Sequence, residues 1–190
     1  MREFASPSTR AAALPRPVRA LYTAFCALTV GGLLSCIGLY DGVVRFGAHT
    51  TPAELYSHLI AYYQPAADRP AAAAGAAVPA PPMSWRKLLE VTHFHLFSMP
   101  IYLLVLGHLF LLTGLRPGAK IGWIAAAGAA TLIHLSAPWC VYFGGAAAAW
   151  IYPISGAALL VTYAVLMGVP LYEMWARPPV SKPYASRAGF

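Results

Sequence analysis

The sequence predicts an all-α integral membrane protein, a four-helix transmembrane bundle with a long periplasmic first loop. Apolar residues make up 59% of the 190-residue chain and charged residues only 10%, a composition far from that of an ordinary soluble domain. Four apolar segments are each long enough to cross about 30 Å of hydrocarbon, which takes roughly 20 helical residues. The basic residues are distributed unevenly between these segments, which is typical of membrane proteins with a fixed orientation.

The four predicted spans form one transmembrane domain, residues 20–176, flanked by two tails. The spans cover residues 20–44, 88–115, 121–143 and 146–175, with a basic tail at 1–19, the first loop at 45–87 and a second tail at 177–190. Tyr and Trp residues near the ends of the spans fit the aromatic belts expected at the two membrane interfaces.

Charge predicts the orientation of the bundle. The two tails and the short turn between the second and third spans share one face, since the number of spans is even. That face carries nine basic residues against two acidic ones, which accounts for the whole net charge of +7, while the first loop and its edges balance to zero. The positive-inside rule then predicts that both termini are cytoplasmic. The basic residues indicate topology and not nucleic-acid binding, because no folded soluble surface gathers them.

Two further features of the spans have simple interpretations. Leu33-Leu34-Ser35-Cys36 loosely resembles a lipoprotein cleavage site, but the apolar run continues through Tyr40, so we expect an uncleaved membrane span. The three cysteines, Cys26, Cys36 and Cys140, form no C-x-x-C-H motif, which excludes covalently attached c-type haem within this chain.

The first loop divides into two parts. Thr51-Pro52-Ala53-Glu54 is typical of a capped helix start, and the apolar and aromatic residues that follow predict an amphipathic helix on the outer membrane face. Residues 65–82 are rich in Ala and Pro and predict a tether with few side chains to bury.

Histidines inside the apolar segments are the main functional signal. Ionisable side chains at membrane depth are costly and therefore mark candidate sites. Four histidines meet this criterion: His93, His95, His108 and His134. We expect His49 and His58, in the first loop, to be solvated surface residues.

Helical geometry separates these four histidines. His93 and His108 lie about 60° apart around one helix and about 22 Å apart along it, whereas His95 lies about 140° from His108. The short turn after the second span predicts an antiparallel hairpin, in which His134 is opposite about Pro100. His95 or His93 is therefore expected to meet His134 near the outer leaflet, while Cys26 and Met167 are nearest in depth to His108.

This geometry resembles, in architecture alone, the membrane subunits of b-type cytochromes, in which histidines on two helices clamp a haem. The resemblance implies haem b held by candidates among His93, His95, His108 and His134. The small residues 125–130 could accommodate the flat macrocycle. The third span has only His134, and the first and fourth have no histidine, so one haem at most is expected from this chain alone.

Most of residues 18–176 is also similar to small bacterial four-helix inner-membrane proteins without an assigned activity. The similarity is carried by 88–115, Ser136-Ala137-Pro138-Trp139 and Pro170-Leu171-Tyr172-Glu173-Met174-Trp175. It implies the fold and brings no residue roles.

The leading hypothesis from sequence is a membrane subunit, not an enzyme on its own, that binds haem b and passes electrons between quinol and a periplasmic redox partner. A second is a structural or assembly subunit whose histidines form internal hydrogen bonds only. A third is a small metal-handling protein in which His93, His95 and His134 bind a transition metal. A transporter is disfavoured by the scarcity of acidic pairs at mid-membrane and the lack of inverted repeats.

Glycines and prolines of the spans predict packing and bending. Gly31, Gly32 and the Gly38–Gly42 pair permit close helix approach, within the bundle or against another subunit. Pro100 and Pro138 are expected to kink their helices close to the histidine level.

Overall fold

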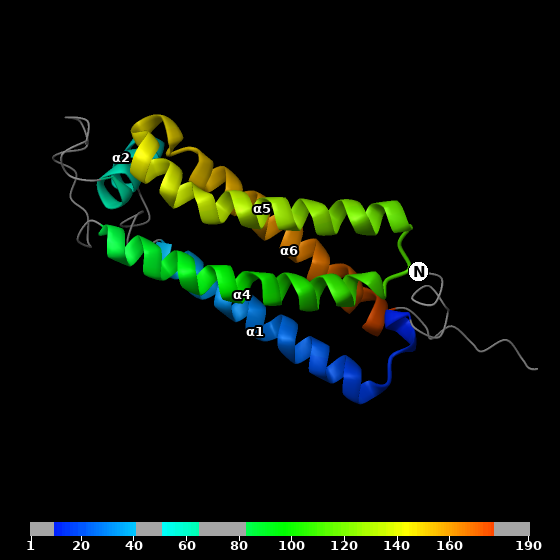
Figure 1. Ribbon diagram of the computed structural model, residues 1–190. Coiled ribbons are helices and arrows are strands. Elements are labelled where there is room, and N and C mark those ends of the chain that lie inside the picture. The colour runs from blue at the N-terminus through cyan, green and yellow to red at the C-terminus, as the bar shows by residue number, and fades with distance from the viewer. Residues whose placement is uncertain (1–9, 41–50, 65–82, 177–190) are drawn as a thin grey trace, which may run out of the picture.

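The computed structural model describes residues 10–40, 51–64 and 83–176, and within these ranges the chain is entirely helical. Four helices are long and apolar enough to cross a membrane, which confirms the predicted bundle. They run antiparallel to their neighbours in the chain, with a short helix at one end of the bundle (Figure 1). The elements are η3 (Ala11–Ala13), α1 (Arg16–Tyr40), α2 (Pro52–Tyr63), α4 (Trp85–Leu111), α5 (Pro117–Gly144), η6 (Gly145–Ala148) and α6 (Ile151–Trp175).

The helix ends differ from the expected spans by a few residues. The second long helix begins and ends earlier than predicted, because Ser84 caps its start by accepting the Lys87 N–H, and its last turn closes at Leu112. The expected fourth span, 146–175, divides at its start: η6 occupies residues 145–148 and α6 begins only at Ile151. Gly145 causes this break, since its φ of 65° lies in the left-handed region that ends a helix.

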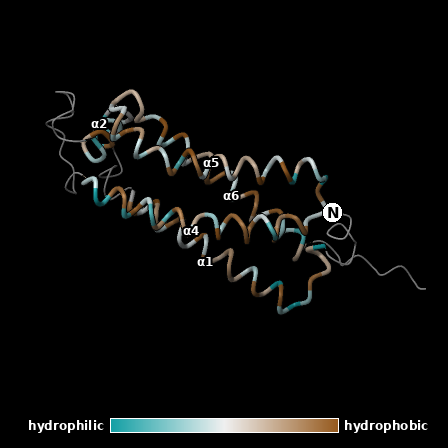
Figure 2. The backbone as a smooth tube through the Cα atoms, viewed as in Figure 1, coloured by the Kyte–Doolittle hydropathy of each residue, from teal (hydrophilic) through white to brown (hydrophobic). Residues whose placement is uncertain are grey.

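The outer surface of the bundle is apolar, as a lipid-facing surface must be. Large side chains on three different helices are mostly exposed, among them Phe94 at 70%, Leu132 at 64% and Ile154 at 67%. Figure 2 shows apolar residues along all the long helices, with hydrophilic ones concentrated towards their ends. This surface would be unstable in water and is stable in hydrocarbon.

Helix α6 is the central element, because it packs against both α5 and α4. Tyr163 is 1% exposed, and its hydroxyl lies 3.3 Å from the Thr131 hydroxyl of α5. Phe110 of α4 is fully buried in the same core cluster. In lipid the helices gain little from hydrophobicity, so close packing and such interhelical bonds hold them together.

The end of the bundle that carries both described termini is fastened by Arg19. Its guanidinium donates hydrogen bonds to the carbonyls of Met174, Leu14 and Ala12, at 2.5, 2.7 and 2.8 Å. Because Met174 lies in the last turn of α6, the positive charge also meets the negative end of the helix dipole. The start of α1 is thereby tied to the end of α6.

The opposite end is covered by α2. Thr51 and Glu54 form the predicted capping box, and Pro52 occupies the first turn, which confirms the helix start expected from sequence. Leu59 and Ile60 are buried against the ends of α5 and α6, and Tyr56 donates a 2.5 Å hydrogen bond to the Ala146 carbonyl. Figure 1 shows α2 seated at this end, beside the turn from α5 to α6.

The sequence left two interfaces open for the glycines of the first span, one within the bundle and one against another subunit. The glycines of α1 that the structure describes do not pack within the bundle, and packing against another subunit stays a prediction. A Cβ atom added at Gly31, Gly32 or Gly38 would meet nothing within 4 Å. Helix α1 contacts the bundle mainly through its first half, where Cys26 is buried and the rings of Phe25 and Tyr102 lie 5.8 Å apart. Gly42, His49 and the tether at 65–82 lie outside the described residues.

Candidate functional site

The structure brings His95 of α4 and His134 of α5 together in one small cavity near the α2 end of the bundle. The cavity has a volume of about 80 Å³, and Tyr63 of α2 and Met83, just before α4, form part of its wall. Its lining residues are Tyr63, Met83, Leu88, Val91, Thr92, His95, His134, Leu135, Pro138 and Tyr152. None of these side chains is an acid, a lysine or an arginine, so the imidazoles are the strongest bases in the cavity.

The orientation of the His95 ring is fixed by its own helix. Its Nδ1 lies 2.7 Å from the carbonyl oxygen of Val91, one turn earlier. A carbonyl only accepts, so in the neutral ring Nδ1 carries the proton and Nε2 keeps its lone pair.

The His134 ring is fixed by α6. Its Nδ1 lies 3.0 Å from the Ser155 hydroxyl, and that hydroxyl donates at 3.0 Å to the Tyr152 carbonyl. Since the single Ser155 proton is used, its oxygen accepts from Nδ1–H, and the neutral His134 also keeps its lone pair on Nε2. Ring contacts hold the imidazole as well, because Tyr152 lies 5.0 Å away and a Cβ added at Gly156 would come within 3.4 Å of Cε1. Both histidines therefore have the same tautomer.

An anchored Nδ1–H with a free Nε2 is the arrangement that metal-binding histidines adopt in proteins. It is equally the arrangement of a base that accepts a proton at Nε2. Pro138 adds a further polar group, because a proline in a helix leaves the carbonyl four residues earlier, that of His134, without its helical hydrogen bond.

The other two predicted histidines lie elsewhere. His93 is exposed on the surface of α4 and contacts Phe97 with tilted rings whose centroids lie 5.0 Å apart. His108 is also on an exposed side of α4, whereas Met167, its expected neighbour in depth, is buried in the core between helices. Neither histidine lines the cavity that holds His95 and His134.

A three-ligand metal site is not formed by the usual residue types in the described part of the chain. No three His, Cys, Asp or Glu side chains there are grouped so that they could hold one ion. The predicted set of His93, His95 and His134 therefore reduces to a pair, because positions 93 and 95 point to different sides of α4.

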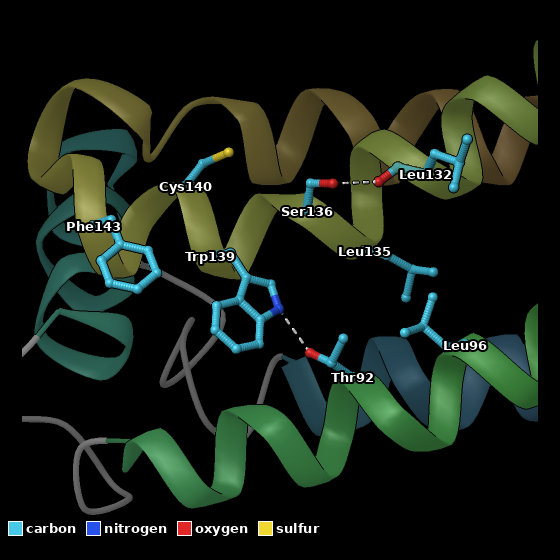
Figure 3. Close-up of a pocket in the computed structure, with 8 residues that line it drawn as sticks. All are labelled: Thr92, Leu96, Leu132, Leu135, Ser136, Trp139, Cys140 and Phe143. Atoms are coloured by element: carbon cyan, nitrogen blue, oxygen red, sulfur yellow. Dashed lines mark hydrogen bonds between the residues drawn. The ribbon is translucent and has the colours of Figure 1, made fainter.

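A second, larger cavity adjoins the first and opens on the outer surface between α4 and α5 (Figure 3). We call it the α4–α5 groove; its volume is about 460 Å³. It is lined by Thr92, Leu96, Leu132, Leu135, Ser136, Trp139, Cys140 and Phe143. Thr92 and Leu135 line both cavities, so these two side chains form part of the wall between them.

Side-chain polar groups in the lining of the groove belong to Thr92, Ser136 and Trp139, together with the Cys140 thiol. Trp139 reaches across from α5 and donates its indole N–H to Thr92 Oγ1 at 2.8 Å (Figure 3). Thr92 in turn donates to the Leu88 carbonyl, and Ser136 donates to the Leu132 carbonyl, both at 2.8 Å. At the α2 end the groove is bordered by aromatic rings, and Trp85 meets Trp139 edge to face with ring centroids 5.1 Å apart.

Sequence comparison then identifies the domain that contains this site. Residues 56–181 match the model of the Aq_1264_TM family, which is described as a transmembrane helical domain. The chain belongs to this family. The match covers most of α2 and all of α4, α5 and α6, and so includes both cavities, whereas α1 lies outside it. No curated protein and no solved structure shows a significant match to the chain.

Ser155, Tyr152 and Thr92 escaped prediction from sequence. Ser and Thr in membrane helices usually bond back to their own helix, and Thr92 and Ser155 do so too. Only the packing of α6 and α5 against their neighbours shows that Ser155 also accepts a hydrogen bond from His134 and that Thr92 accepts one from Trp139.

Proposed function

We propose that this protein is an inner-membrane subunit of a quinol-linked electron-transfer system and that the His95–His134 pair is its functional centre. The observation that carries the proposal is the similar anchoring of the two rings, each with its Nδ1 within hydrogen-bond distance of an oxygen atom and both lining one cavity. Two imidazoles whose Nε2 atoms keep their lone pairs suit either a bound metal or proton exchange coupled to electron transfer.

Haem b is the occupant predicted from the histidine pattern. A cavity of about 80 Å³ has room for a few water molecules at roughly 30 Å³ each, or for a single ion. A macrocycle would also have to take space from the α4–α5 groove, which requires Leu135 and Leu96 to move apart. If haem binds, His95 and His134 are the ligands it would use, and a redox-active iron would be the chemistry it supplies.

The orientation predicted from charge indicates on which side of the membrane this centre lies. Arg10, Arg16, Arg19, Arg116 and Lys120 lie at the end opposite α2. With that end in the cytoplasm, the histidine pair lies near the periplasmic leaflet. A periplasmic redox protein that docks at the α2 end would then be the electron partner.

The purified protein tests the proposal directly. We expect the preparation to contain bound haem, bound transition metal or bound quinol, and a bound haem or metal should be lost in His134→Ala while the protein still inserts. The matched control is His108→Ala, the same substitution on an exposed side of α4, which should leave the bound species in place. A preparation with none of the three would refute the proposal.

One observation favours a second function, that of a structural or assembly subunit. Each ring is already satisfied by one internal hydrogen bond, which is all that a purely structural histidine needs. In that case His134→Ala would lower stability and nothing else, so the same preparation separates the two functions.

A further inference from the structure

The α4–α5 groove combines an apolar surface with a small polar centre. Leu96, Leu132 and Phe143 line it and are 52%, 64% and 71% exposed, so the groove opens to the lipid phase and not to the interior. Its volume of about 460 Å³ lies within the range of small-molecule sites, about 300–1,000 Å³. A molecule that diffuses in the bilayer could therefore enter sideways.

The hydroxyl groups in the groove determine which ligand chemistry fits. Thr92 and Ser136 both use their protons inward, on the carbonyls of Leu88 and Leu132. The Ser136 oxygen keeps both lone pairs for the groove, and the Thr92 oxygen keeps one beside the bond it accepts from Trp139. The centre of the groove thus offers hydrogen-bond acceptors, and a ligand that pairs with it must bring donors.

We propose that the α4–α5 groove binds the reduced form of a membrane quinone, with its two hydroxyls donating to Thr92 and Ser136 and its tail leaving towards lipid. An aromatic diol brings two O–H donors on a flat apolar ring, whereas the oxidised quinone has only acceptors. Stacking against Trp139 adds to the binding of a flat ring.

This inference rests on the proposed function, because the site lies one side chain away from the His95–His134 cavity. Thr92 and Leu135 line both spaces, so a bound quinol would be next to the two bases. A haem at the histidine pair would need part of the same groove. Haem and quinol therefore compete for the space between α4 and α5, and finding one counts against the other.

The test measures binding of decylubiquinol and decylubiquinone to the full chain in lipid nanodiscs, as ligand retained per chain above that of empty nanodiscs. We expect saturable binding of one quinol per chain, with the quinone at least about threefold weaker, the cost of one lost hydrogen bond. Decylbenzene, which has the same tail and no oxygens, should not compete.

Two substitutions in α5 test whether the ligand binds in the groove. Ser136→Leu fills the groove and should weaken quinol binding by at least about tenfold, within the range that overpacking costs. Ala129→Leu adds the same side chain at an exposed position of α5 that does not line the groove, and should leave binding unchanged. Equal affinity in the two variants, equal affinity for quinol and quinone, or competition by decylbenzene would each overturn the inference. A haem spectrum that depends on His134, without quinol binding, would overturn it and leave the proposed function standing.

Discussion

Removing the Ser155 hydroxyl tests whether α6 fixes the tautomer of His134. Ser155 is 3% exposed and links two helices, because it accepts from His134 Nδ1 and donates to Tyr152, each at 3.0 Å. In Ser155→Ala the buried Nδ1–H loses its acceptor. The neutral ring then either keeps an unsatisfied donor, which lowers the free energy of unfolding, or carries its proton on Nε2 instead.

The size of the effect follows from these contacts. Side-chain hydrogen bonds between membrane helices contribute about 0.6 kcal/mol on average and up to about 1.7 kcal/mol. An unsatisfied buried donor costs about 1–3 kcal/mol. Because Ser155 is nearly fully buried, we expect Ser155→Ala to lower the free energy of unfolding by about 1–2 kcal/mol.

The assay is reversible unfolding in mixed micelles, together with nitrogen NMR of the labelled imidazole to read the tautomer. The matched control is Ser35→Ala, since Ser35 is exposed on α1 and donates only to the Gly31 carbonyl of its own helix. We expect the control to change stability by less than about 0.5 kcal/mol. If the two variants are equally stable and the His134 proton stays on Nδ1, the role assigned to Ser155 is wrong.

Three further predictions concern other parts of the molecule. A reporter fused at Ala74 should be active only in its periplasmic form, since the charge bias places both termini in the cytoplasm; cytoplasmic activity would reverse the orientation. Gly145→Ala should destabilise the α5–α6 turn by about 1–2 kcal/mol, measured by unfolding, because φ is 65° there; Gly118→Ala, where an added Cβ meets nothing within 4 Å, is the control. Hydrogen bonds from the Thr51 backbone and hydroxyl lower the pKa of Glu54 below its usual 4.5. At pH values above its unfolded-state pKa, this carboxylate therefore stabilises α2. The stabilisation is lost as the pH falls through the lower pKa of the folded state. In an NMR titration Thr51→Ala should raise the pKa of Glu54, and an unchanged value would contradict the capping box.

The sequence was sufficient for the parts of the fold that depend on local composition. The four spans follow from apolar length, the start of α2 from the Thr51–Glu54 spacing, and the α4–α5 hairpin from its short turn. The proximity of His95 to His134 could also be predicted, because an antiparallel hairpin fixes the relative depth of its residues. The choice between His93 and His95 could not, since it depends on how α4 rotates against α5 and α6.

Features that depend on packing between distant segments could not be predicted from the sequence. The bond from His134 to Ser155 joins residues 21 positions apart on separate helices, and no periodicity encodes it. The glycines of α1 could not be assigned to packing within the bundle or against another subunit from sequence alone. A small-residue pattern permits close approach but does not say that a neighbour is present, and a Cβ at Gly31 would meet nothing within 4 Å.

The sideways opening of the α4–α5 groove has a practical consequence for anyone who measures ligands of this protein. The groove opens on the apolar outer surface, where Leu96, Leu132 and Phe143 are exposed. For a ligand that enters from the bilayer, the concentration that governs occupancy would be its mole fraction in lipid. Apparent dissociation constants expressed per volume of water will therefore shift with the amount of lipid or detergent in the sample. Comparisons between homologues or inhibitors are meaningful only at a fixed ratio of lipid to protein.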